Sequence, residues 1–201
     1  MKHAKIMARL HRAAEERLIC NLYMKGKAYY INCWPLLVSE EMAVCAHDID
    51  FLLNGYGAYP IDCIDRVVIK QDKCTEYSRL EGIVEQLTVP EVACASWQAF
   101  FASLPVDQLV GVERMNTPVD EADFAVGRIM KAGKKRLQMM CVDSEAVWED
   151  EPWRIRYCDI TEVTFGDRYL TVFGKYAGQP ANEAVQKAMA CNASDGGNDK
   201  C

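Results

Sequence analysis

One apolar pattern occurs twice in this sequence, 96 residues apart, and it limits the fold more than any other feature. At this offset Cys45 aligns with Cys141, and Ile64 aligns with Ile160. The phase of strand alternation agrees in both stretches, and a slip of one residue would turn every side chain to the other face of a sheet. We therefore expect two copies of one unit, each made of five short strands followed by a helix.

Alternating apolar residues predict the strands, with turn residues between them. The predicted strands span residues 18–24, 28–34, 42–47, 59–63 and 67–70, then 108–115, 123–130, 136–142, 153–157 and 160–165. Helical spacing predicts helices over residues 2–18, 72–87 and 91–104, and a last one from 168 to 176. Asp72 and Asp167 are placed to cap two of these helices, and Gly166 permits the sharp turn before the last one. We expect Tyr169 to pack back onto the sheet.

Short, bent antiparallel strands remove their edges by closing, so the pattern favours small barrels. The fold class expected is mainly β with flanking helices (α+β), as two tandem five-stranded barrels joined by a helical connector. The domains expected are residues 1–87 with the N-terminal helix and first barrel, 88–105 as connector, 106–178 with the second barrel, and 179–201 as a mostly disordered tail.

The stretch from Asp150 to Tyr169 contains the string D-I-T-E-V-T-F-G-D-R-Y and resembles a segment of uncharacterised bacterial proteins with Sm-like barrels. Glu16-Arg17-Leu18-Ile19 and Asn54-Gly55-Tyr56 are similar to single-barrel members of that group. Together the two resemblances cover roughly residues 10–80 and 110–177. They imply the Sm-like fold and no activity. Better-known Sm proteins bind U-rich RNA, but this chain departs from both of their RNA-binding loops, so no RNA-binding residue is carried over.

The charge balance argues against nucleic acid as the general partner, because the chain has 23 Lys and Arg against 29 Asp and Glu. The N-terminal helix is the local exception. Its basic residues would be the phosphate contacts of a weak RNA binder, which is our alternative function: Lys2, Lys5, Arg9 and Arg12. A solvated helix face explains the same residues.

The ten cysteines include no C-x-x-C pair, which removes the main support for a zinc or thioredoxin-type site. Most lie in apolar stretches, where a reduced thiol behaves as a small hydrophobe. The charged N-terminus and the absence of an apolar run of about 18–20 residues predict a cytoplasmic protein without a membrane partner.

His47 is the one histidine beside carboxylates, with Asp48 and Asp50 close in sequence. A hydrolase or metal enzyme at His47 and Asp50 is therefore a further alternative, although a polar strand-to-loop end is the favoured explanation of these residues, because such a site normally needs several convergent groups. The familiar serine-hydrolase, phosphate-loop and zinc-protease motifs do not occur. We expect no catalytic residues, no cofactor and no metal.

Aromatic residues gather in two loops that the repeat makes equivalent, residues 51–59 and 148–153. If exposed, they would form a partner surface: Phe51, Tyr56, Trp148 and Trp153. Burial against the connecting helices is the alternative. The function expected is a binding or interaction module with an unidentified protein partner and no catalysis. An immunity or antitoxin role would suit the composition equally, and the oligomeric state is not determined by the sequence.

Overall fold

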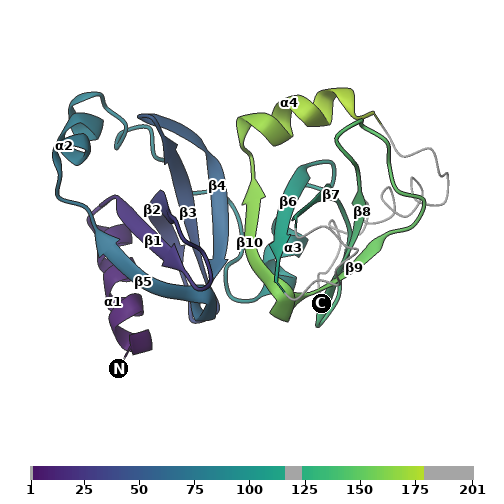
Figure 1. Cartoon of the computed structure of the whole chain (residues 1–201), viewed down its shortest axis with the longest axis horizontal. Helices are drawn as coiled ribbons and strands as arrows, with labels where there is room; N and C mark the ends of the chain where they lie inside the picture. Colours follow the sequence, from purple (N-terminus) through teal and green to yellow (C-terminus); the bar gives the residue numbers. More distant parts are fainter. Residues whose placement is uncertain (1, 116–123, 179–201) are drawn as a thin grey trace, which may run out of the picture.

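Ten antiparallel strands form a single sheet in the computed structural model, which describes residues 2–115 and 124–178 (Figure 1). The strand order across the sheet is β5-β1-β2-β3-β4-β10-β6-β7-β8-β9. The first five strands are β1 (Cys20–Met24), β2 (Tyr30–Val38), β3 (Met42–Ile49), β4 (Leu52–Pro60) and β5 (Ile64–Ile69). The second five are β6 (Leu109–Arg114), β7 (Phe124–Ala132), β8 (Arg136–Cys141), β9 (Trp153–Arg156) and β10 (Ile160–Phe165).

The expectation of two tandem Sm-like barrels is wrong, because the sheet is continuous and is not closed into barrels. The edge of β4 pairs with β10, with Val163 opposite Ala58 and Phe165 opposite Tyr56. An unpaired strand edge exposes a row of backbone donors and acceptors, and β10 satisfies them for β4. The two halves are therefore not separate units, although each half has its fifth strand paired with its first.

Within the described residues four helices accompany the sheet, with α1 beneath the first half and α4 above the second in Figure 1. The helices are α1 (Lys2–Glu15), α2 (Lys73–Leu80), α3 (Trp97–Ser103) and α4 (Arg168–Tyr176). One 3-10 turn precedes the last strand of each half, η1 (Ile61–Cys63) before β5 and η2 (Tyr157–Asp159) before β10. The apolar face of α1 is buried on the first half, since its buried residues recur at helical spacing. None of the described helices is both long and apolar enough to cross a lipid bilayer.

The hydrophobic core of the second half extends across the junction between the halves. α3 places Phe100 and Phe101 in this core, where both are almost fully buried. Met42 and Val44 of β3 and Ala58 of β4 belong to the same cluster, although they lie in the first half of the chain. The two halves thus share apolar contacts as well as backbone hydrogen bonds.

The helices between the halves are shorter than the sequence predicts. α2 ends at Leu80, because Gly82 has a positive φ of 70° that stops a right-handed helix. Only 97–103 of the expected helix over 91–104 is helical, and Ser96 caps its start. The predicted tail, residues 179–201, lies outside the described residues.

Both predicted aspartate caps are present. Asp72 accepts a hydrogen bond from the Thr75 amide at 2.9 Å, and Asp167 accepts one from the Leu170 amide at 2.7 Å. The expected packing of Tyr169 onto the sheet is wrong, because this side chain is 57% exposed and stacks on Phe173 within α4.

The predicted loop over residues 51–59 is mostly strand β4. This strand was not predicted because it contains two glycines, and glycine weakens the strand pattern of a sequence. Gly57 leaves space that the His47 ring and the Tyr59 hydroxyl occupy, and a Cβ at Gly55 would overlap the backbone of Asp167. The glycines are explained by contacts distant in sequence, and these contacts also position the site described next.

Candidate functional site

The structure separates the two residues of the predicted catalytic or metal site. His47 Nε2 lies 2.5 Å from the Tyr59 hydroxyl, whereas Asp50 is exposed at the turn between β3 and β4. Asp48 accepts hydrogen bonds from the Trp34 indole and the Phe51 amide, both at 3.2 Å. Across the described residues, no group of three His, Cys, Asp or Glu side chains could hold a metal ion.

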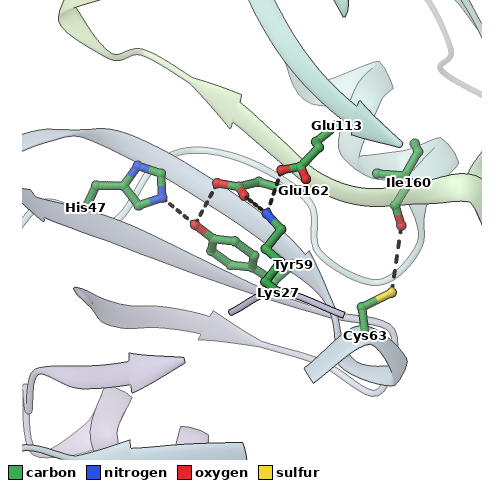
Figure 2. A network of polar contacts seen from close by, with 7 residues as sticks. All are labelled: Lys27, His47, Tyr59, Cys63, Glu113, Ile160 and Glu162. Atoms are coloured by element: carbon green, nitrogen blue, oxygen red, sulfur yellow. Dashed lines mark hydrogen bonds and ion pairs between the residues drawn. The ribbon is translucent and has the colours of Figure 1, made fainter. Parts of the chain in front are cut away.

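His47 instead begins a chain of polar contacts that crosses from the first half to the second (Figure 2). The Tyr59 hydroxyl donates to Glu162 Oε1 at 3.0 Å, so it can accept the hydrogen of His47 Nε2. The Lys27 ammonium lies 3.0 Å from Glu162 Oε2 and 2.6 Å from Glu113 Oε2. We call these five residues the seam network.

Glu113 and Glu162 are directly opposite each other on β6 and β10. Like charges at opposite positions destabilise a sheet, so a cation is needed between them. Lys27 supplies it from the turn after β1, and its side chain is only 11% exposed. Burial alone would lower the pKa of Lys27, but hydrogen bonds and charge from the two glutamates outweigh burial and raise this pKa.

The two groups at the other end of the seam network are held neutral. Burial raises the pKa of Tyr59 well above its usual value, and the charge of Glu162 raises it further. Burial lowers the pKa of His47 to about 4, and the more distant Asp167 offsets only part of this effect. His47 is thus a neutral hydrogen-bond donor near pH 7, and each member of the network has a partner within the protein.

The predicted RNA contacts are largely engaged with the protein itself. Lys2 lies 2.5 Å from Asp65, Arg9 donates to the Val67 carbonyl at 2.7 Å, and Arg12 pairs with Glu16 at 3.0 Å. Lys5 is exposed. Two of these four cations, Lys2 and Arg12, are thus paired with carboxylates, whereas Arg9 and Lys5 keep their charge uncompensated by these contacts.

The four predicted aromatic partner residues do not form one exposed surface. Tyr56 stacks on Phe165, and the Trp148 indole donates to the Ala177 carbonyl at 2.7 Å. Trp153 is half-buried under the guanidinium of Arg114, which is 4.9 Å from the ring centre. Phe51 alone is exposed, at the turn between β3 and β4.

The residues on either side of this turn, Ile49 and Leu52, line a hollow that the sequence did not predict. This hollow has a volume of about 720 Å³ and lies between the β3–β4 hairpin and α4; we call it the hairpin groove. Its walls are aliphatic or cationic, and the remaining positions are small or polar. The lining residues are Ile49, Leu52, Leu53 and Val172, then Arg168 and Lys175, then Asn54, Gly55, Gly166 and Thr171.

The two walls of the hairpin groove are fixed to each other. The Arg168 amide at the start of α4 donates to Asn54 Oδ1 at 2.9 Å. The backbone of β4 passes so close to Asp167 that only glycine fits at position 55, where φ is +70°. The groove is therefore preformed, and a ligand would not have to order its walls.

The turn at the edge of the groove contains backbone strain. Asp50 and Phe51 both have positive φ, 52° and 64°, in the left-handed region. Two-residue hairpins need this conformation but usually obtain it from Asn-Gly or Asp-Gly. A phenylalanine in this conformation costs roughly 1–2 kcal/mol, and such strain is concentrated at functional sites.

The sequence contains only weak signals for the seam network and for the hairpin groove. A carboxylate within an apolar strand, as at Glu113 and Glu162, indicates a buried partner but does not identify Lys27. Asp50-Phe51 is not a hairpin signal, and the groove depends on contacts between residues more than 100 positions apart. Comparison of the chain with protein-family models, curated proteins and solved structures gives no match. The resemblance to Sm-like proteins therefore transfers no residue role.

Lys27→Met should destabilise the protein by roughly 2 kcal/mol at pH 7, less than the loss of one partner from a fully buried pair. The substitution leaves Glu113 and Glu162 facing each other without the intervening charge. Urea unfolding at pH 7 measures the effect. Lys73→Met is the control, since it breaks the exposed pair with Glu76 and should cost under about 0.5 kcal/mol. Equal losses in the two variants would contradict the role of Lys27.

His47→Gln should reduce the acid sensitivity of folding. The unfolded chain binds a proton on His47 near pH 6.5, and the folded protein only near pH 4. This contribution to stability is therefore complete above pH 6.5 and is lost as the pH falls towards 4. Between pH 7 and pH 4.5 the wild type should lose roughly 2 kcal/mol more than His47→Gln. A wild-type slope in His47→Gln would refute the assignment.

Proposed function

We propose that the protein is a binding protein that holds a segment of another polypeptide in the hairpin groove and has no catalysis of its own. The observation that carries the proposal is the preformed groove with exposed aliphatic walls. Leu52 is 69% exposed and Ile49 is 52% exposed, on a hairpin anchored to α4. Contiguous exposed apolar surface beside polar groups is typical of interaction sites.

The size and chemistry of the hairpin groove support this proposal. Ligand pockets usually have volumes of roughly 300–1,000 Å³, with apolar walls and few polar groups. The groove has about 720 Å³ and the same mixture of groups. Gly55 and Gly166, which have no side chains, are among its lining residues.

The hydrogen bonds of the seam network support the proposed absence of catalysis. Its histidine, tyrosine, lysine and glutamates are hydrogen-bonded to one another and connect the two halves of the sheet. None of these residues lines the hairpin groove. A catalytic site would place such groups where a substrate can reach them.

A cytoplasmic location is part of the proposal. The eight cysteines within the described residues are all free thiols, and four of them are buried. Thiols in this state are typical of a reducing compartment. The raised pKa values of Cys20 and Cys141, both caused first by burial, suit an inert role in the core.

Site-specific photo-crosslinking tests the proposed function. A photo-crosslinking amino acid at position 52 should give one protein adduct in cells, and the same residue at position 172 should give the same adduct. Position 80 is a matched control, because Leu80 is 75% exposed and lies outside the groove. Different adducts from positions 52 and 172, or an equal adduct from position 80, would contradict the groove as the binding site.

Phe51→Gly should separate stability from binding. Glycine adopts the left-handed conformation without the strain of a side chain, so the variant should be more stable by roughly 0.5–1 kcal/mol. The variant loses an exposed ring between Ile49 and Leu52, which both line the groove, so the adduct yield from position 172 should fall several-fold if the ring contacts the bound segment. Thermal unfolding and adduct quantification measure the two effects. A variant that is more stable and binds as well as the wild type would show that Phe51 has no part in binding.

A further inference from the structure

We infer that the hairpin groove selects an acidic segment rich in aliphatic side chains from its partner protein. This inference rests on the proposed function and specifies the chemistry of the bound segment. One wall of the groove is cationic, its apolar side chains are aliphatic, and the hollow is concave.

Positive charge is concentrated on the α4 wall of the groove. Arg168 and Lys175 line it, and none of the lining residues is acidic. The chain as a whole has a net charge of −6, so this surface is a local exception. Within residues 2–115 and 124–178, neither side chain forms an ion pair or a side-chain hydrogen bond, which leaves both cations available to an anionic partner. Complementary charge of this kind provides specificity and speeds association.

The apolar part of the groove favours a polypeptide over a nucleic acid. Proteins bind single-stranded nucleic acids by stacking bases on aromatic rings. The groove walls are instead formed by the aliphatic side chains of Ile49, Leu52, Leu53 and Val172. Aliphatic walls fit leucine-like or isoleucine-like side chains, which a protein segment provides and RNA does not.

A concave site also favours a segment over a flat surface. A hollow of about 720 Å³ takes side chains that project from a chain, whereas a lipid bilayer would meet only the rim. A smaller hollow of about 360 Å³ adjoins it and shares Gly166, Thr171 and Lys175. Asp107 lines that second hollow, so the acidic side chains of the partner should lie on the Arg168 side of Lys175, away from Asp107.

A random 12-residue peptide library displayed on phage, selected on the full chain and counter-selected on Leu52→Asp, tests the inference. We expect enriched peptides to combine Leu, Ile or Val with at least two Asp or Glu. A synthetic peptide from this set should bind Lys175→Glu on the order of tenfold more weakly than the wild type. Replacing its acidic residues by Lys should restore binding to Lys175→Glu and remove binding to the wild type.

The outcomes separate the inference from the proposed function. Aliphatic peptides without acidic residues, or peptides indifferent to Lys175→Glu, would overturn the inference and leave the groove function standing. Failure to enrich any peptide that depends on Leu52 would overturn both. Binding of poly-uridine or of phosphatidylserine vesicles that is lost in Leu52→Asp would overturn the polypeptide as occupant. A dimer of this chain that is lost in Leu52→Asp would do the same.

Lys73→Glu is the matched control for the charge reversal. Lys73 is an exposed lysine on α2, outside the hairpin groove, and replacing it by glutamate changes the net charge as much as Lys175→Glu does. Peptide affinity should be unchanged in this variant. An equal loss of affinity in Lys73→Glu and Lys175→Glu would show that net charge acts rather than the groove, and the inference would fall.

Discussion

The pairing of β4 with β10 is the interaction on which the remaining structure depends. It joins two half-sheets that would otherwise each expose an unpaired edge. It also brings Lys27 of the first half to two carboxylates that face each other in the second. Neither half satisfies these groups alone, so backbone pairing and charge pairing support the same arrangement.

The same pairing creates the hairpin groove. β10 ends at Phe165, the chain turns at Gly166, and α4 starts directly after Asp167. Because β4 lies beside β10, the β3–β4 hairpin reaches the start of α4, where Asn54 accepts from the Arg168 amide. The seam network joins Lys27 to Glu162 and Glu113 at this junction, and the groove lies where the hairpin meets α4. The binding that we propose would therefore use other side chains than those that stabilise the junction.

Most strands could be predicted because apolar alternation is a local property, and the two aspartate caps could be predicted for the same reason. β4 could not be predicted, because its glycines are required by close contacts with Asp167 and with the His47–Tyr59 pair. Barrel closure was wrongly predicted because a strand pattern does not say which edge a strand will join. Lys27 was missed because a lysine in a Gly-containing turn is usually solvated, and only tertiary structure places Glu113 and Glu162 beside it.

The turn at Asp50 and Phe51 is informative because a single substitution would make it more stable. A glycine at position 51 would remove the strain, and a polar residue would remove the exposed ring. Strain of this kind persists when the surrounding structure fixes it, here through Asp48 and the β3–β4 ladder. Proteins commonly tolerate lower stability where function needs an unfavourable residue. We therefore infer that Phe51, strained, exposed and between two residues that line the groove, would contact the bound segment that we propose.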